Sequence, residues 1–170
     1  IYLNINKYCL KDMRHSLEVG FSFGLTSAVI TTLGLMIGLG AGTNSKLVVI
    51  GGIITIAIAD ACSDALGIHV SEESENIHSQ LEIWEATIAT FLSKFLFALT
   101  FLVPVLLLDL FAATIVSIIY GLILLGVFSY FLAKKQKQSV LNVVGEHLIT
   151  AILVIIVTYY VGLGVSIMFG

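Results

Sequence analysis

Charged side chains are scarce in this sequence, and their scarcity decides the class of protein. Asp, Glu, Lys and Arg together make up 11% of the 170 residues, whereas hydrophobic residues make up 58%. A soluble domain usually carries about a quarter charged residues, because water must solvate its surface. With a mean hydropathy of +1.07, this chain has too little charge to cover a water-facing surface. We therefore expect lipid to be the solvent for most of it.

Cysteine and proline are also rare. The two cysteines, Cys9 and Cys62, fall before the first expected span and within the second, so we expect no disulfide between them. The net charge is only −3 and no basic stripe is present, which argues against a nucleic-acid partner. The first residues lack an apolar core followed by a small-residue cleavage site, so we expect no secretory signal peptide. The single proline, Pro104, is expected to kink the end of the third span.

Long apolar runs are what the sequence has in abundance. A helix that crosses a bilayer needs about 20 apolar residues. Five runs qualify, at about residues 17–41, 46–70, 83–108, 110–133 and 140–169. Residues 40–44 read as a loop, residues 71–82 as a short acidic loop, and Asp109 separates the third and fourth runs. We expect an all-α integral membrane protein of five transmembrane helices, with residues 1–170 forming a single membrane domain.

Lys and Arg near the ends of the spans predict the orientation. One basic cluster precedes the first span, and another lies between the fourth and fifth. These clusters comprise Lys7, Lys11 and Arg14, and Lys134, Lys135 and Lys137. With five spans both clusters lie on one side, and the loops of the opposite side contain only Lys46. The positive-inside rule then places the N-terminus and the acidic loop in the cytoplasm and the C-terminus outside.

Two acidic residues fall inside the second apolar run. A charge at the centre of a bilayer costs at least about 2.5–3.5 kcal/mol, so such residues are usually functional. Asp60 and Asp64 are one turn apart and lie within about 40° of each other on a helix. If the helix continued beyond the membrane, Ser71, Glu75 and His78 would share that face. The stripe would then lead from the middle of the bilayer to the cytoplasm.

The stripe allows two interpretations. In the first, Asp60 and Asp64 line a cation pathway, because carboxylates are hard ligands for divalent metals. Two close carboxylates also favour retention of a proton by one of them, which suits proton-coupled transport. In the second, the acids form a structural ion pair with Lys94, the only basic residue deep in a span. Lys94 could instead extend to the edge of the membrane.

The loop and the last span contain further candidates. Glu72, Glu75 and His78 could capture a metal in the cytoplasm, or they could belong to a solvated polar loop. Glu146, beside His147, is a candidate for a proton or ion-pair role, or an interfacial residue near the basic loop. Gly34, Gly38 and Gly42 are spaced for close helix packing, against the second helix or across a dimer axis.

Three segments of the chain are similar to the vacuolar iron transporter family of iron and manganese transporters. The first, Phe23-Gly24-Leu25-Thr26-Ser27-Ala28 with Gly34, resembles the family's D-G-L-x-[ST]-T stretch and its downstream glycine. The second, Ser63-Asp64-Ala65-Leu66-Gly67-Ile68-His69-Val70-Ser71, resembles S-M-x-x-G-E-Y-x-S. The third, Val157-Thr158-Tyr159-Tyr160-Val161-Gly162, is similar to the closing V-T-Y-x-x-G. The order of five spans matches as well.

The resemblance implies a homodimeric helical bundle that exports Fe²⁺ or Mn²⁺ from the cytoplasm in exchange for protons. Three departures qualify this expectation. The family's acidic residue in the first helix corresponds to Phe23, its methionine in the second helix to Asp64, and its glutamate to Ile68. Replacing a thioether by a carboxylate should shift selectivity toward harder cations. The loop is also too short for the long cytoplasmic metal-binding segment of the plant members.

The leading hypothesis is therefore a divalent metal transporter of the cell membrane, which carries Fe²⁺ or Mn²⁺ as cargo and holds no permanent cofactor. The alternative is a membrane scaffold or partner subunit that retains the fold without transporting. An enzyme is not expected, because no helix face combines Ser with His, Cys with His, or the H-E-x-x-H pattern.

Overall fold

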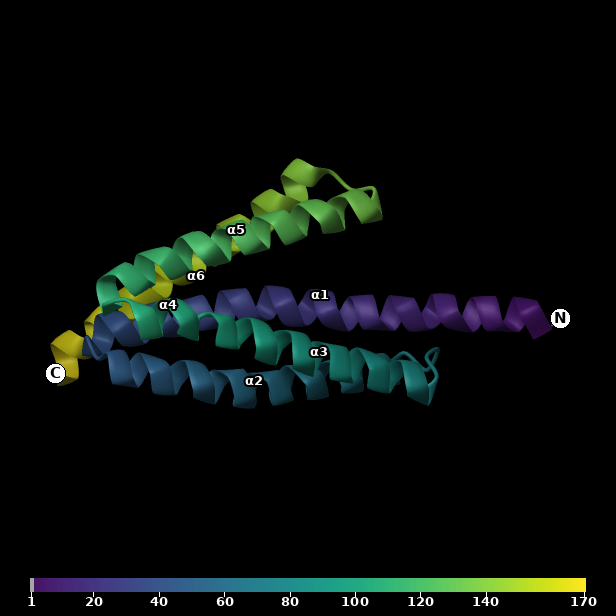
Figure 1. Ribbon diagram of the computed structural model, residues 1–170, viewed down its shortest axis with the longest axis horizontal. Coiled ribbons are helices and arrows are strands. Elements are labelled where there is room, and N and C mark those ends of the chain that lie inside the picture. The colour runs from purple at the N-terminus through teal and green to yellow at the C-terminus, as the bar shows by residue number, and fades with distance from the viewer. Residues whose placement is uncertain (1) are drawn as a thin grey trace. The chain divides into compact units, whose positions relative to one another are not determined.

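The computed structural model describes the backbone of residues 2–170 and the side chains of residues 15–170 (Figure 1). These residues form helices and no strand. The helices are α1 (Tyr2–Thr43), α2 (Lys46–Ser74), α3 (Gln80–Thr100), α4 (Leu102–Leu107), α5 (Leu110–Gln136) and α6 (Val140–Phe169). Cys9 and the basic residues Lys7, Lys11 and Arg14 lie outside the described side chains.

The prediction of five long apolar helices is confirmed. The segments long and apolar enough to cross a membrane are His15–Thr43, Lys46–Ser74, Gln80–Leu107, Leu110–Gln136 and Val140–Phe169. Each contains the corresponding predicted run, except that the third ends at Leu107, one residue before the predicted end. The helices extend beyond the apolar runs because backbone hydrogen bonds continue into polar residues at the interface.

The third span consists of two helices that meet at Phe101. α3 ends at Thr100 and α4 begins at Leu102, so the interruption lies just before Pro104, where a kink is expected. A proline ring clashes with the carbonyl four residues earlier, which here belongs to Thr100, and it cannot donate to that carbonyl. Phe101 N–H instead bonds the carbonyl of Ala98, three residues back, at 3.2 Å.

The ends of the spans differ from the predicted loops at two places. Residues 40–43 are helical, and α1 ends only before Asn44, whose φ of 46° is left-handed. The acidic loop is shorter than residues 71–82, because α2 continues to Ser74 and α3 begins at Gln80. A capping box explains this start: Ser79 N–H and Oγ both donate to Glu82 Oε2 at 2.7 Å.

Asp109 begins α5 as predicted for the turn between the third and fourth spans. Its backbone is extended, and its carboxylate accepts a hydrogen bond from Ala112 N–H at 3.1 Å. An aspartate in this position satisfies one of the free N–H groups of the first turn. The other end of α5 stops at Lys137, whose φ of 56° is left-handed.

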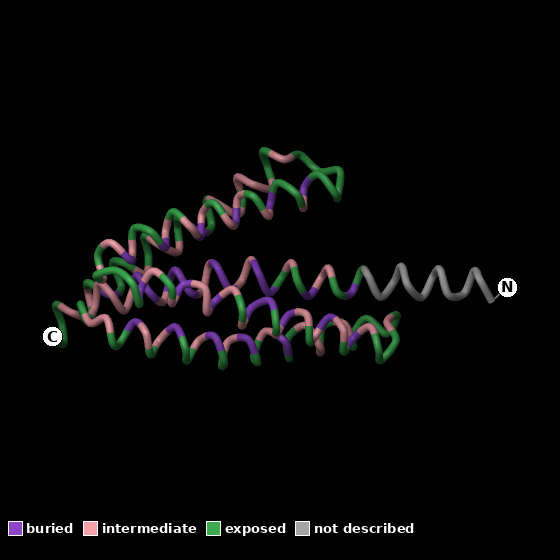
Figure 2. Tube along the Cα trace, in the orientation of Figure 1, coloured by how far each residue is buried: buried purple, intermediate pink, exposed green. Residues whose placement is uncertain are grey.

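Contacts divide the chain into two compact units. Unit 1 comprises Ile1–Ala28 and Thr55–Phe97, and unit 2 comprises Val29–Ile54 and Ala98–Gly170. Small side chains dominate the buried positions of unit 1. Figure 2 marks the buried positions along the chain in purple. On α2 they recur every four residues, at Ala57, Ala61 and Ala65. In lipid, helices associate mainly by close packing, so small residues at this spacing mark the face of α2 that packs.

Unit 2 also relies on small residues. The buried face of α5 repeats every four residues, at Ala113, Ser117, Gly121, Leu125, Ser129 and Ala133. α5 packs extensively on α6. One contact is polar: Ser129 Oγ lies 2.6 Å from His147 Nδ1. These residues are spaced four apart in the sequence, and the structure shows that they form the buried face of α5.

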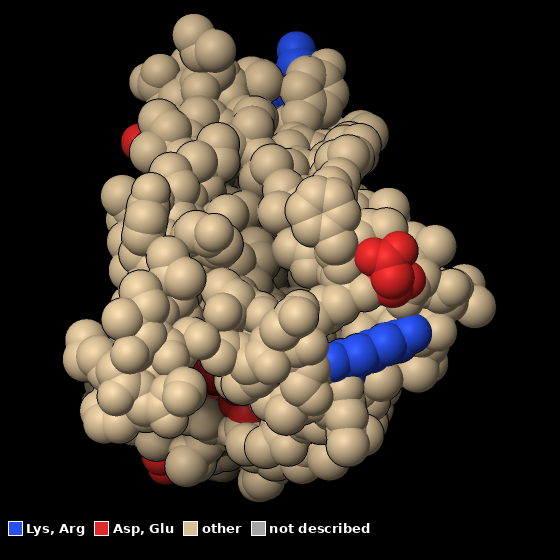
Figure 3. Space-filling view, turned by 90° about the vertical axis from the view of Figure 1, so that its left-hand side faces the viewer, with Lys and Arg blue, Asp and Glu red and all other residues tan. Residues whose placement is uncertain are grey.

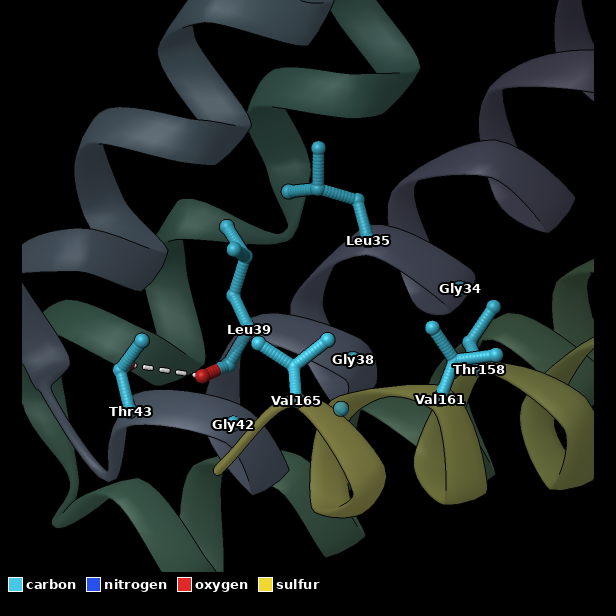
Figure 4. Close-up of a pocket in the computed structure, with 10 residues that line it drawn as sticks. Gly34, Leu35, Gly38, Leu39, Gly42, Thr43, Thr158, Val161 and Val165 are labelled. Carbon is cyan, nitrogen blue, oxygen red and sulfur yellow. Dashed lines mark hydrogen bonds between the residues drawn. The ribbon is translucent and has the colours of Figure 1, made fainter. Parts of the chain in front are cut away.

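The glycine line Gly34, Gly38 and Gly42 packs against α6, so the prediction that its partner is the second helix is wrong (Figure 4). A Cβ on Gly34 would meet Val154, one on Gly38 would meet Thr158, and one on Gly42 would meet the backbone of Gly162. On α6, Gly162 faces Gly38 and Gly42. The backbones of α1 and α6 can approach this closely only because neither helix carries a side chain at the crossing. An apolar cavity of about 350 Å³ borders this crossing.

Much of the surface is apolar. Leu107, Phe111, Leu141 and Ile167 are each more than three-quarters exposed. Figure 3 shows a face on which charged side chains are few. Water would not solvate such a surface well, whereas lipid chains match it.

Gly162→Ala should destabilise unit 2 by about 1–3 kcal/mol through overpacking. The added Cβ would lie 2.1 Å from the Gly38 carbonyl oxygen. Gly164→Ala is the matched control, because its Cβ meets only the end of the Met168 side chain at 4.0 Å. Thermal unfolding in detergent would measure both. Equal melting temperatures for the two variants would contradict the close crossing.

Candidate functional site

Two acidic side chains and one serine of unit 1 meet around the ammonium group of Lys94. Asp60 and Asp64 come from α2, Lys94 from α3 and Ser27 from α1. Lys94 is 1% exposed and is one of the largest fully buried side chains among residues 15–170. A buried lysine keeps its charge only when acceptors and opposite charges surround it. The geometry of its contacts therefore decides what the cluster can do.

Three oxygen atoms surround Lys94 Nζ. Asp60 Oδ2 lies 2.5 Å away, Asp64 Oδ2 is in direct contact, and the ammonium donates to Ser27 Oγ at 2.8 Å. Ser27 in turn donates its hydroxyl hydrogen to Asp64 Oδ2 at 2.7 Å. Lys94 therefore makes two hydrogen bonds, to Asp64 and Ser27, and an ion pair with Asp60. Ser27 also connects the lysine to the Asp64 carboxylate.

The two carboxylates are not equivalent. Asp64 is hydrogen-bonded to both Lys94 and Ser27. Asp60 Oδ2 is a buried atom that makes no hydrogen bond. Its contact with Lys94 Nζ is an ion pair without the geometry of a hydrogen bond. Asp60 is therefore the carboxylate with acceptor capacity left over.

The cluster carries excess negative charge. Two carboxylates face a single ammonium, which leaves one negative charge without a cation among the contacts of Asp60, Asp64 and Lys94. The carboxylate side chains are 26% and 19% exposed, against 2% for Lys94. The lysine is thus enclosed, while both acids remain accessible from outside the helix packing. An excess of carboxylates over ammonium groups attracts cations.

Two glycines of α1 allow this geometry. A Cβ on Gly20 would lie 2.2 Å from the Ala86 carbonyl oxygen, and one on Gly24 would lie 2.0 Å from Ser93 Oγ and 2.6 Å from the Thr90 carbonyl oxygen. α1 and α3 can therefore touch only because both positions lack a side chain. Ser27 follows Gly24 by three residues, so the same face of α1 carries its hydroxyl to Lys94.

Sequence reasoning missed these three residues. Gly20 and Gly24 form the same small-residue spacing as the line Gly34, Gly38 and Gly42, and that spacing was the available signal. Apart from its place in the first segment that resembles the transporter family, Ser27 had no signal, because a single serine in an apolar helix usually bonds its own backbone.

The acidic loop brings its three predicted residues together. His78 Nε2 lies 3.4 Å from Glu72 Oε2 and 3.3 Å from Glu75 Oε2. Glu75 and His78 are not part of the α2 helix, however, because α2 ends at Ser74. The expected continuous helical stripe from Asp60 to His78 is therefore wrong. Asn76, with a left-handed φ of 56°, turns the chain after the helix end.

The remaining candidates have other surroundings. His69 Nδ1 lies 3.0 Å from Thr87 Oγ1, and its ring meets Trp84 edge-on at 4.8 Å. Glu146 belongs to unit 2 and is exposed in the first turns of α6. Cys62 is a free, exposed thiol. Among the described residues, no three His, Cys, Asp or Glu side chains are arranged to hold a metal ion. At Asp60 and Asp64, Lys94 takes up the central position.

Comparison of the chain with protein-family models, curated proteins and solved structures finds no match. The geometry of the cluster and the chemistry of its side chains therefore carry the functional argument.

Lys94→Met should destabilise unit 1 by about 3 kcal/mol, because it leaves two partly buried carboxylates without their cation. Adding Asp64→Asn should restore part of the loss by removing one of those charges. Thermal unfolding of the single and double variants in metal-free detergent solution would measure the effect. A double variant less stable than Lys94→Met alone would contradict the ion pairing.

Proposed function

We propose that this protein is an integral membrane transporter of divalent metal cations, whose cargo binds at Asp60 and Asp64. The observation that carries the proposal is the excess carboxylate of the cluster. A structural ion pair requires only one acid and one base, and a second acid in a membrane helix adds a cost of several kcal/mol. A passing cation would offset that cost.

The ligands favour a hard cation. The acceptors around the central position are the oxygens of two carboxylates and one hydroxyl. Such ligands suit Mn²⁺ and Fe²⁺ as well as Mg²⁺, and suit soft metals poorly. The resemblance to the vacuolar iron transporter family favours Fe²⁺ or Mn²⁺, with export from the cytoplasm coupled to protons. Asp64 in place of the family's methionine supports the harder of these ions, Mn²⁺.

The proposal includes the cellular location and the membrane topology of the protein. Five apolar helices would span the cell membrane, with the N-terminus and the acidic loop in the cytoplasm and the C-terminus outside. The basic residues before the first span and after the fourth support this orientation. Glu72, Glu75 and His78 would then form the cytoplasmic approach to the site, and Glu146 would lie at the same interface. A homodimer follows from the family resemblance alone.

One observation favours a second candidate, a scaffold or partner subunit that does not transport. Lys94 contacts both acids and is enclosed, as a permanent ion pair would be. The two functions differ in whether Asp60 is needed once the protein is folded.

The test is metal flux in proteoliposomes that contain a metal-quenched dye. Asp60→Asn and Asp64→Asn should each reduce Mn²⁺ flux about tenfold or more, because bonds to charged groups contribute about 1.5–3 kcal/mol. Asp109→Asn is the matched control, since an asparagine still caps α5. Wild-type liposomes with no more Mn²⁺ or Fe²⁺ flux than empty liposomes would favour the scaffold.

A further inference from the structure

We infer that the Lys94 ammonium occupies the cation-binding position itself and competes with the cargo as a tethered, internal cation. This inference rests on the proposed function, because it names the group that the cargo must displace. It also assigns Ser27 as the third oxygen of the site.

The first step is the arrangement around Lys94 Nζ. One atom of each of three side chains points to a single centre: Asp60 Oδ2 and Asp64 Oδ2 from α2, and Ser27 Oγ from α1. Every group is an oxygen, and together they carry two negative charges. This is the ligand type and charge that a hard divalent cation takes in proteins. The ammonium is a compact point charge and fits the same centre.

The second step concerns charge. With Lys94 in place, the three charged side chains sum to −1, and a divalent ion added beside it would meet an adjacent positive charge. With the ammonium withdrawn, a divalent ion at the centre would neutralise both carboxylates. The cargo and the ammonium are therefore alternatives at one position. Exchange requires only that the flexible lysine chain move away with its charge retained.

The third step is the role of Ser27. Its hydroxyl accepts from Lys94 and donates to Asp64 at the same time. When the ammonium leaves, the lone pair that faced Lys94 becomes available to the cargo, while the bond to Asp64 holds the carboxylate in place. Ser27 therefore positions Asp64 and supplies a ligand.

A tethered competitor has a functional consequence. It weakens the affinity of the site for metal, because the metal must first displace a cation that never diffuses away. It also fills the site after release, so the two carboxylates are not left bare within the membrane. Removing the charge of Lys94 should therefore increase the affinity of the site for the metal ion and slow the release of that ion.

The experiment measures Mn²⁺ binding to purified protein in detergent by electron paramagnetic resonance of the free ion. Lys94→Met and Lys94→Gln should each bind Mn²⁺ about tenfold tighter or more than wild type, because a positive charge within contact distance is removed. Lys94→Arg should stay near wild type, since it keeps the charge. Lys134→Met is the matched control, because it removes a lysine charge at the end of α5 and should leave Mn²⁺ affinity unchanged.

Ser27 is tested in the Lys94→Gln background. Ser27→Ala should weaken Mn²⁺ binding several-fold, whereas Ser27→Thr, which keeps the hydroxyl, should preserve it. Asp60→Asn in the same background should lose the tighter binding. Unchanged or weaker Mn²⁺ affinity in both Lys94→Met and Lys94→Gln would overturn the inference.

Thermal unfolding with and without Mn²⁺ serves as a control for the folding of the variants. Mn²⁺ should raise the melting temperature of Lys94→Gln more than that of wild type, because the metal replaces the missing cation. No greater rise would count against the inference. Failure of the proposed function has a different signature: Lys94→Gln would bind Mn²⁺ tightly while wild-type liposomes showed no flux.

Discussion

The contact of Lys94 with two carboxylates of α2 is the interaction around which unit 1 is built. Three charged groups are placed in apolar helices, where each alone would cost several kcal/mol. Their mutual attraction offsets that cost only if three helices approach within hydrogen-bond distance of one ammonium. The small residues follow from this requirement. Gly20 and Gly24 let α1 touch α3, and the alanines of α2 are buried in the same unit.

The same contact explains why the site is stable and yet leaves one carboxylate oxygen without a hydrogen bond. Lys94 is enclosed, has two hydrogen-bond acceptors and pairs with both carboxylates, so it stabilises the packing. Asp60 contributes a buried oxygen that no hydrogen bond satisfies. Native structures leave few such atoms, and each calls for a reason. Here the reason we propose is a cation that passes through, with Lys94 as its substitute between passages.

Close helix crossings occur in both units, as expected for helices that associate in lipid. Lipid chains are as apolar as leucine, so burying leucine between helices gains little, and association depends on packing density and polar contacts. Gly162 against Gly38 and Gly42 provides the packing in unit 2. Ser129 with His147 provides a polar contact there. The large apolar side chains remain on the outside, at positions such as Phe111 and Leu141.

The amino-acid sequence by itself determined the five spans, because about 20 apolar residues in a row have few alternatives to a membrane helix. It also placed the interruption near Pro104, the turn at Asp109, and Asp60 and Asp64 on one helix face. These features depend on local chemistry and helical periodicity. Only the tertiary structure decided which groups meet. That Lys94 reaches both acids, that Ser27 joins them, and that the glycine line faces α6 depend on contacts between helices far apart in the sequence. A periodic pattern shows that a face packs, but the complementary shape of another helix selects its partner.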